Sequence, residues 1–281
     1  MGSGVATYYD RLGRWNRWAR AVGYGGGSGA LTVHRALADP RAGGRVTFTR
    51  LHDVLLEQLA GLASPRVLDA GCGLGGTMLA LAEGIGATCV GLTLSPSQAA
   101  VANAEAARRH LGSRVRAEVR SYDSPPSGPF DLIVAIESLA HSLDPGRSVV
   151  ALSATLAPGG RLVVVDDMPE PDAVRSEDLQ VFKRGWQCPV LWPVTSYLEA
   201  FARAGLVVDA QLDLTSQSRP RSSVGIALLR ACNRVVRTWP SEAFRQVMDS
   251  HDGGLALERL TRDGLVRYRL LVARRPELQV S

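Results

Sequence analysis

Three side chains with acid–base chemistry follow apolar runs that have the composition of β-strands. Glu137 and His141 come after the run Phe130–Ile136, and Asp166 ends the run Arg161–Asp166. In α/β proteins, ligands bind at the carboxyl ends of such strands. An imidazole with a pKa of about 6.5 can remove a proton at neutral pH. We therefore treat His141 as a candidate base; a structural role for His141, and a cap or salt bridge for Asp166, are the alternatives.

A glycine-rich turn follows an earlier apolar run, in the segment Val67–Gly76 with the letters VLDAGCGLGG. Glycines permit positive φ and let a ligand lie against the backbone, and the helix that follows presents free N–H groups. In dinucleotide-binding folds the acidic residue follows the second strand, whereas Asp69 ends the first. This position favours a ligand with an ammonium and a sulfonium over a pyrophosphate. A turn needed only for tight strand–helix packing is the alternative.

Residues 64–167 alternate β-rich runs with helical patterns, which is typical of a parallel sheet covered on both faces. The segment Ser95–Gln98 has a capping-box start and predicts a helix to about His110. Asp144 and Pro145 predict another helix start, with an end expected at Pro158–Gly160. The strands expected here are Arg66–Ala70, Thr88–Leu92, Val115–Val119, Phe130–Ile136 and Arg161–Asp166.

Further motifs follow the glycine turn in a familiar order. Asp123 comes after the third expected strand, Pro129-Phe130-Asp131 opens the fourth, and Leu156–Gly160 precedes the fifth. With these motifs the sequence resembles the class I S-adenosylmethionine-dependent methyltransferases over residues 64–170. The resemblance implies an α/β fold with a doubly wound, mostly parallel seven-stranded, Rossmann-like sheet and helical lid segments.

Shorter segments are similar to two small-molecule branches of that family. Gly91–Gln98 resembles the GITLSPxQ segment of tocopherol C-methyltransferases. Glu137–His141 resembles the ESxxH segment of that group and of rebeccamycin-type sugar O-methyltransferases. Tyr8-Tyr9-Asp10 fits the start of such enzymes, and Asp213–Pro220 resembles a region of the sugar enzymes. These matches imply a small-molecule acceptor, such as a natural product, a sugar or a lipid-like metabolite.

The resemblance implies S-adenosyl-L-methionine as cofactor, S-adenosyl-L-homocysteine as product, and no metal. Many class I enzymes carry an acid at the end of the second strand to bind the ribose, but here Thr93 takes that place, as in the tocopherol-like group. The residues expected to bind the cofactor are Tyr8, Asp69, Gly71, Cys72, Gly73, Thr93, Leu94, Gln98, Tyr122, Asp123, Ser124 and Glu137.

Methyl transfer is an in-line displacement in which the protein positions the acceptor and excludes water. The sugar enzymes imply His141 and Asp166 as an acid–base pair for O-methylation. C- or N-methylation of tocopherol-like type is the alternative, with Glu137 stabilising a carbocation or removing its proton. A cyclisation that keeps the cofactor, a non-catalytic binding protein and an RNA-binding methyltransferase are further alternatives.

Sequence patterns divide the chain into an N-terminal helical lid at 1–60, a cofactor-binding core at 61–167, and residues 168–281, which complete the sheet and add a substrate-binding helical insertion. The acceptor pocket is expected to include Trp15, Tyr24, Trp186 and Trp192. The flanking elements expected are an amphipathic stretch at Phe48–Leu62, a helix from a Thr195 cap to Ala204-Gly205, a strand at Val207–Leu212, helical structure over 222–250 and a strand at Leu265–Ala273.

Composition agrees with an enzyme that has a small-molecule substrate. The chain has 281 residues and a net charge of +5, and all of its basic residues except Lys183 are arginines scattered among apolar residues. Scattered charge argues against a nucleic-acid partner. The four cysteines form no CxxC pair, which argues against structural zinc. No apolar run is long enough for a membrane helix and no secretion signal is apparent, so we expect a cytoplasmic protein without a membrane partner. The sequence leaves a homodimer open.

Overall fold

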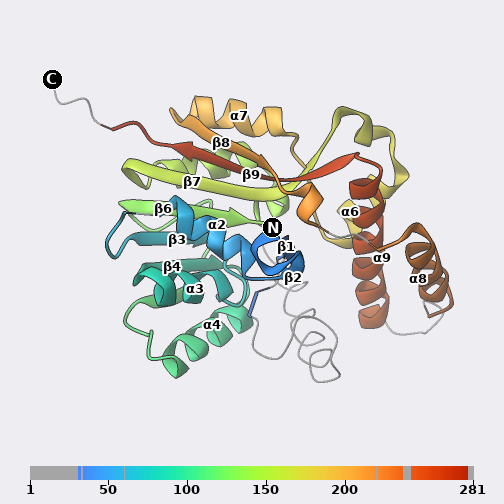
Figure 1. Cartoon of the computed structure of the whole chain (residues 1–281), viewed down its shortest axis with the longest axis horizontal. Helices are drawn as coiled ribbons and strands as arrows, with labels where there is room; N and C mark the ends of the chain where they lie inside the picture. Colours follow the sequence, from blue (N-terminus) through green and yellow to red (C-terminus); the bar gives the residue numbers. More distant parts are fainter. Residues whose placement is uncertain (1–30, 33, 60, 219–220, 237–241, 278–281) are drawn as a thin grey trace.

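A seven-stranded sheet forms the centre of the molecule in the computed structural model, which describes residues 31–277 except 33, 60, 219–220 and 237–241 (Figure 1). The strand order is β5-β4-β3-β6-β7-β9-β8. β3, β4, β5, β6 and β7 run parallel, and β9 pairs antiparallel with both β7 and β8. The strands are β3 (Arg66–Ala70), β4 (Thr88–Thr93), β5 (Val115–Val119), β6 (Phe130–Ile136), β7 (Leu156–Pro169), β8 (Val207–Asp213) and β9 (Val266–Arg274).

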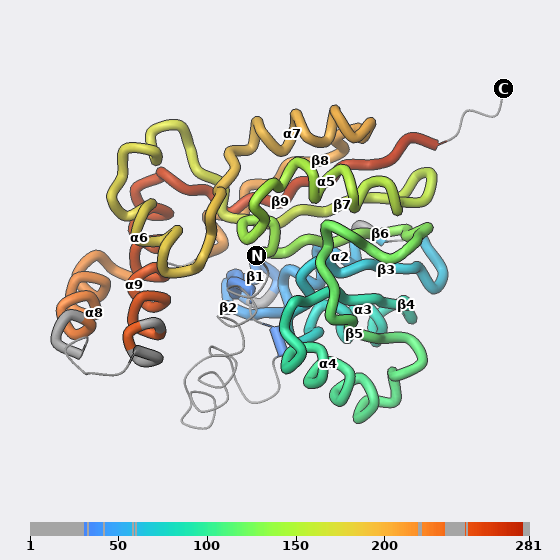
Figure 2. The backbone as a smooth tube through the Cα atoms, turned by 180° about the vertical axis from the view of Figure 1, so that it is seen from behind, coloured from blue at the N-terminus to red at the C-terminus, as the bar shows by residue number. Residues whose placement is uncertain are grey.

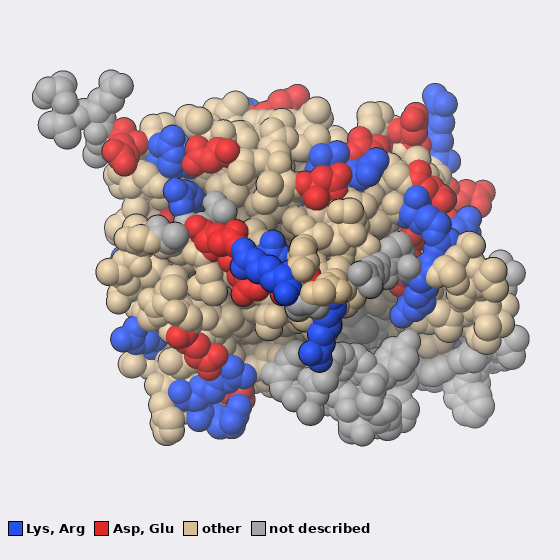
Figure 3. Space-filling model, in the orientation of Figure 1, with Lys and Arg blue, Asp and Glu red and all other residues tan. Residues whose placement is uncertain are grey.

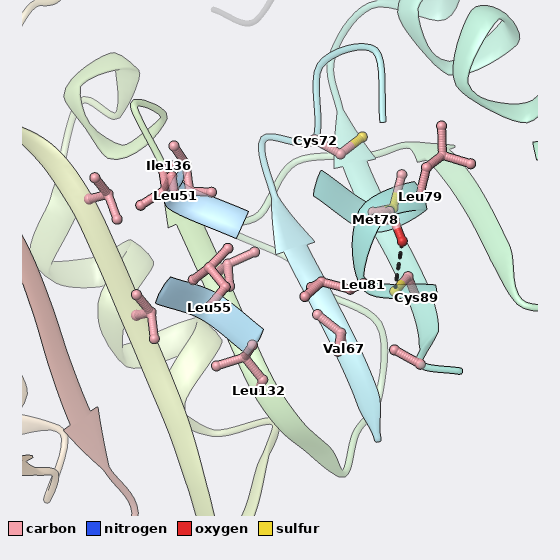
Figure 4. Packing of buried hydrophobic residues seen from close by; sticks show 14 of the residues in the cluster. Leu51, Leu55, Val67, Cys72, Met78, Leu79, Leu81, Cys89, Leu132 and Ile136 are labelled. Carbon is pink, nitrogen blue, oxygen red and sulfur yellow. Dashed lines mark hydrogen bonds between the residues drawn. The ribbon is translucent and has the colours of Figure 1, made fainter. Parts of the chain in front are cut away.

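Helices cover both faces of the sheet because alternate residues of the central strands are buried on opposite sides. Val67 of β3 packs with the helices α2 (Arg50–Gln58), α3 (Gly76–Ile85) and α4 (Pro96–Arg108). Its neighbour Leu68 packs with α5 (Pro145–Ser153) and α7 (Val194–Arg203). Figure 4 shows Leu51 and Leu55 of α2 against Leu132 and Ile136 of β6. Figure 2 shows α5 and α7 from behind.

A smaller helical unit lies beside one end of the sheet (Figure 1). It comprises α6 (Glu177–Gly185), α8 (Ser223–Val236) and α9 (Glu242–Arg262), with Phe182 and Leu257 in its buried core. The helices approach closely at two glycines: a Cβ added to Gly185 would lie 3.0 Å from the Cα of Gly253. The helical insertion expected over 222–250 is therefore present, and it extends to residue 262.

The strands expected from the sequence are confirmed: β3, β5 and β6 match at both ends, β4, β8 and β9 shift by one residue, and β7 is longer. Two expected helix ends were wrong. α5 ends at Ser153, because β7 begins at Leu156 and takes up the Pro158–Gly160 turn within the strand. The helix expected from a Thr195 cap starts two residues earlier, at Val194, with Pro193 as its cap residue.

The N-terminal region differs from the expected helical lid in the part that the structure describes. β1 (Leu37–Asp39) and β2 (Arg45–Thr47) form an antiparallel hairpin, joined by the short η1 turn (Pro40–Ala42). The amphipathic stretch at 48–62 contains the helix α2, as expected. Residues 1–30, which make up half of the expected lid, lie outside the described residues.

Charged side chains of both signs are interspersed over the face shown in Figure 3. Several arginines pair with neighbouring acids, for example Arg109 with Glu83 and Glu105, and Arg221 with Glu258. Among the helices in the described ranges, none is both long and apolar enough to cross a membrane.

Candidate active site

The glycine turn after β3 is held tightly between two strands. The backbone N–H groups of Gly71 and Cys72 both donate to the carbonyl of Leu92, at 3.0 and 2.9 Å. Gly71 has a φ of 103°, and a Cβ added there would lie 2.4 Å from the Cβ of Ser138. Gly73 is also left-handed, with a φ of 51°. The turn therefore lies directly against the end of β6, with no space for a side chain at Gly71.

Asp69 supplies a buried carboxylate immediately before this turn. Burial of the carboxyl group raises the pKa of Asp69 to about 7. Ser138 Oγ, on the other side of Gly71, is buried and has no hydrogen-bond partner in the described part of the chain. A buried carboxylate and an unsatisfied hydroxyl beside a backbone turn fit a ligand with an ammonium group. The amino acid end of S-adenosylmethionine has this chemistry.

The residues expected on the ribose side lie together at the end of β4. Thr93 Oγ1 donates to Gln98 Oε1 at 2.7 Å and accepts from the backbone N–H of Ser95 at 3.1 Å. Ser95 Oγ in turn accepts from the Gln98 backbone N–H and caps α4. Leu94 lies half-buried between them. These bonds fix the loop that follows β4. The Thr93 hydroxyl and the Gln98 side chain are bonded to each other, so a change in one would move the other.

The three residues expected at the adenine edge occupy the turn after β5. The Tyr122 hydroxyl donates to the Ser138 carbonyl at 3.1 Å, and burial raises the pKa of this phenol. Asp123 Oδ1 accepts from the Ser148 hydroxyl at 2.5 Å. Ser124 is exposed. Tyr122 therefore links this turn to the end of β6, while Asp123 links it to α5.

His141 lies on a short turn that begins at the end of β6. Glu137, the first residue after β6, has a φ of 48°, and the η2 turn (Leu139–His141) follows. His141 Nδ1 lies 3.2 Å from the carbonyl oxygen of Gln187, in the loop after α6. A carbonyl only accepts hydrogen bonds, so Nδ1 carries the proton in this contact and Nε2 carries the lone pair. Burial lowers the pKa of His141, which favours the neutral imidazole at pH 7.

Asp166 lies inside the same edge of the sheet, near the end of β7. Its two carboxylate oxygens accept from the backbone N–H groups of Ala140 and Asp167, at 3.2 and 2.9 Å. Burial, followed by the neighbouring charge of Asp167, raises its pKa well above the usual range for a carboxyl. Both effects favour the protonated form of Asp166 relative to an exposed carboxyl. Its bond to Ala140 also brings it to the turn that carries His141.

A group of residues that the sequence analysis missed surrounds Glu137. Arg35 Nη2 donates to both carboxylate oxygens of Asp167, at 2.8 and 3.0 Å. The Arg35 backbone N–H and the Tyr268 hydroxyl both donate to Glu137 Oε1, at 2.8 and 2.9 Å. Only Asp167, which follows Asp166 directly, had a sequence signal that could have placed it here. Arg35 and Tyr268 come from segments more than a hundred residues from Glu137 and carry no motif.

The aromatic residues expected to line the acceptor pocket lie in different packing clusters. Trp186 donates from Nε1 to the Ser250 carbonyl at 3.0 Å and packs against Phe182 in the helical unit. Trp192 packs against Tyr197, which belongs to α7. Trp15, Tyr24 and the expected cofactor residue Tyr8 lie outside the described residues. No cluster of three potential metal-ligating His, Cys, Asp or Glu side chains occurs within the described ranges.

Comparison with known proteins identifies the family to which the chain belongs. A family described as a methyltransferase domain matches residues 24–211, which include the glycine turn, Glu137, His141 and Asp166. The chain belongs to this methyltransferase family. The sheet order and the glycine motif are those of its class I, S-adenosylmethionine-dependent members, so the resemblance and the fold class expected from the sequence are confirmed.

Curated relatives of the methyltransferase act on small molecules by their names. A probable tocopherol O-methyltransferase of Oryza sativa is 32% identical over 66% of this chain and 53% of that protein. An ajmaline N-methyltransferase of Rauvolfia serpentina is 24% identical over 96% of this chain and 97% of its own length. The methyltransferase thus spans about half the length of the rice relative.

Solved structures show the same fold. The 4+2 cyclase SpnF superposes with a TM-score of 0.75 at 23% identity, covering 97% of this chain and 95% of that chain. Geranyl diphosphate C-methyltransferase from Streptomyces coelicolor superposes with a TM-score of 0.71 at 20% identity, covering 98% and 97% of the two chains. That structure contains S-adenosyl-L-homocysteine, Mg²⁺ and geranyl diphosphate.

The buried carboxyl of Asp69 predicts that cofactor affinity depends on pH. Its pKa of about 7 in the free protein means that it is protonated below pH 7, whereas a bound ammonium requires the carboxylate. Binding must then displace a proton, so the affinity for S-adenosylhomocysteine should fall about tenfold per pH unit below the pKa. The α-amino group of the ligand, with a pKa of about 7.7–8.0, stays protonated in this range.

Calorimetry at pH 5.5, 6.0, 6.5 and 7.0, in buffers of different ionisation enthalpy, measures both the affinity and the displaced proton. Asp69→Asn is the matched control, because it keeps the shape and cannot titrate; its weaker affinity should be flat over this range. An equally steep pH dependence in Asp69→Asn would assign the effect to another group.

Proposed function

We propose that this methyltransferase moves the methyl group of S-adenosylmethionine to a hydroxyl of a small molecule, with His141 as the general base. The observation that supports this most strongly is the state of His141. Its Nδ1 faces the Gln187 carbonyl and its pKa is lowered by burial, so a neutral imidazole with its lone pair on Nε2 is favoured at neutral pH. An imidazole in this state is suited to accept the proton of a hydroxyl as the new bond forms.

Asp166 would act as the acid member of the pair. Burial raises the pKa of Asp166, which favours the protonated carboxyl, a form that can donate a hydrogen bond. Its bond to the Ala140 N–H joins it to the residue before His141. We infer that His141 removes the proton of the acceptor hydroxyl. Asp166 would hold the turn through its bond to the Ala140 N–H, and its protonated form would donate a hydrogen bond in the site.

The cofactor would lie along the carboxyl ends of β3 and β4, and its sulfonium would supply an activated methyl group with a neutral thioether as leaving group. Asp69 and Ser138 would bind the amino acid end, and Gly71 would admit it against the backbone. Thr93, Leu94 and Gln98 would bind the ribose, with Tyr122, Asp123 and Ser124 near the adenine. Burial of Asp69, Asp166 and Asp167 supports a site from which water is largely excluded.

C- or N-methylation is the second candidate, and it is supported by relatives such as the ajmaline N-methyltransferase. Glu137 would then be the carboxylate nearest to the developing positive charge. Cyclisation without methyl transfer has a structural neighbour in SpnF, which shares the fold at 23% identity. The position of the new methyl group decides between these chemistries.

Two measurements test the proposal. Calorimetry should show binding of S-adenosylhomocysteine in the micromolar range, and an intact protein that binds none would contradict the assignment. A panel of phenols, sugar-bearing natural products, prenylated quinols and amines, incubated with S-adenosylmethionine, should yield a product one CH₂ heavier. NMR of that product then locates the methyl on oxygen, carbon or nitrogen; carbon or nitrogen would overturn O-methylation.

A further inference from the structure

Residues 31, 32, 34 and 35 lie along the sheet edge that carries the proposed site. At one end, a Cβ added to Gly76, the first residue of α3, would lie 2.5 Å from Thr32 Oγ1 and 2.9 Å from the carbonyl carbon of Leu31. At the other end, Arg35 contacts Glu137 after β6 and Asp167 in β7. Leu31 and Thr32 therefore lie at the start of α3, and Arg35 lies at the turn that leads to His141.

Arg35 closes a ring of four residues from four separate segments. Its guanidinium bonds to Asp167 and lies 4.7 Å from the centre of the Tyr268 ring, and its backbone N–H and the Tyr268 hydroxyl share Glu137 Oε1. Asp167 is almost fully buried, at 4% exposed. A guanidinium suits such a site better than an ammonium, because it can bond to a carboxylate and stack on an aromatic ring together.

Glu137 connects this ring to His141. It has a left-handed backbone, with a φ of 48°, which is costly for a residue with a side chain. Its backbone N–H donates to the Val165 carbonyl at 2.7 Å, and its carboxylate is held by Arg35 and Tyr268. The chain then closes the turn through the His141 N–H and the Ser138 carbonyl, at 3.1 Å. Contacts to the Glu137 side chain thus hold the backbone that aims His141.

We propose that Arg35 is a positioning residue: by binding Glu137 and Asp167 at the sheet edge it sets the turn that carries His141. This inference rests on the proposed function, in which His141 is the base. Arg35 itself would touch neither the cofactor nor the acceptor. Its loss would let the turn relax and admit water around His141.

The test compares Arg35→Gln with Arg41→Gln. Arg41 lies six residues further along the chain, in the turn of the β1–β2 hairpin. It pairs with Glu57, but both side chains are exposed, so its loss controls for removing one arginine nearby. Arg35→Gln should lower kcat at least tenfold, with a smaller change in the KM for the acceptor. NMR titration of His141 in the complex with S-adenosylhomocysteine should show its pKa rising toward the ordinary value. Arg41→Gln should leave both unchanged.

Two further variants separate positioning from mere stability. Arg35→Lys keeps the charge but loses the planar fork, so kcat should be intermediate. The double variant Arg35→Gln/Asp167→Asn also removes the carboxylate that loses its arginine partner in Arg35→Gln. Its melting temperature should therefore be higher than that of Arg35→Gln, whereas its kcat should stay low because the turn is still not held. If Arg35→Gln changes only the melting temperature and leaves kcat and the His141 pKa at wild-type values, the proposal is wrong. Failure of the proposed function would appear differently, as a wild-type protein that transfers no methyl group, and the His141 titration would still report on Arg35.

Discussion

Replacing His141 by alanine is expected to lower kcat by about 10²- to 10⁴-fold, the usual contribution of a positioned general base. The affinity for S-adenosylhomocysteine should change little, because the residues proposed to bind the cofactor lie on the glycine turn and on the loops after β4 and β5. Steady-state kinetics with the acceptor found in the screen, together with calorimetry, separates the two effects.

His141→Gln is the matched control, since its amide N–H₂ can still donate to the Gln187 carbonyl while it cannot accept a proton at neutral pH. It should be as slow as alanine. The wild-type rate should rise with pH through the pKa of His141, whose midpoint lies below its ordinary value because burial lowers it. Activity should therefore persist below pH 6.5, the ordinary value. Wild-type turnover by either variant would reject the base role.

Replacing Gly71 by alanine is expected to reduce cofactor affinity at least tenfold and to destabilise the fold. The added methyl carbon would lie 2.4 Å from Ser138 Cβ, so either the turn or the end of β6 must move. The left-handed φ of 103° adds a cost of about 1–2 kcal/mol for a residue with a Cβ. Overpacking typically lowers the free energy of unfolding by a further ~1–3 kcal/mol. Thermal unfolding and calorimetry with S-adenosylhomocysteine measure the two consequences.

Gly205→Ala separates the backbone cost from the clash. Gly205 has a φ of 71° at the end of α7, and a Cβ there would meet nothing within 4 Å, so this variant should lose stability but retain cofactor affinity. Adding Ser138→Gly to Gly71→Ala removes the atom that clashes and should restore part of the lost thermal stability, while the affinity stays low because the Ser138 hydroxyl is also lost. Cofactor binding by Gly71→Ala at the wild-type level would show that the turn does not face the ligand.

Local pattern was sufficient to predict the sheet core and much of the site. β3 and β6 were found from runs of buried apolar residues, and the start of α4 from the Ser95 hydroxyl that caps it. The end of α5 was not found, because a glycine turn that usually separates two elements is here incorporated into the start of β7. The turn lies where the pairing of β7 with β6 is irregular, between Leu156 opposite Phe130 and Arg161 opposite Leu132, so it forms a bulge in the strand rather than a separate loop.

The part of the site that the sequence could not predict depends on long-range contacts. Asp69 and His141 stand out because their chemistry follows a strand within a few residues. Arg35 and Tyr268 gain their roles only when β7 and β9 pair and the N-terminal segment crosses the edge. Neither has a neighbour in the sequence that would reveal this contact. The strained φ of Glu137 is likewise a property of the folded chain.

The pairing of β8 with β9 has a consequence for exchanging the helices that lie between them in the sequence. These strands are neighbours in the sheet, so the chain that leaves β8 and enters β9 begins and ends at nearly the same place, and the pair α8–α9 is an excursion from one hairpin. The entropic cost of closing such an excursion grows only slowly with its length. The proposed cofactor-binding loops follow β3, β4 and β5, on the opposite half of the sheet. The sequence predicts that this helical insertion binds the acceptor, and exchanging α8 and α9 at the hairpin would test that prediction while the proposed methyl donor site stays constant.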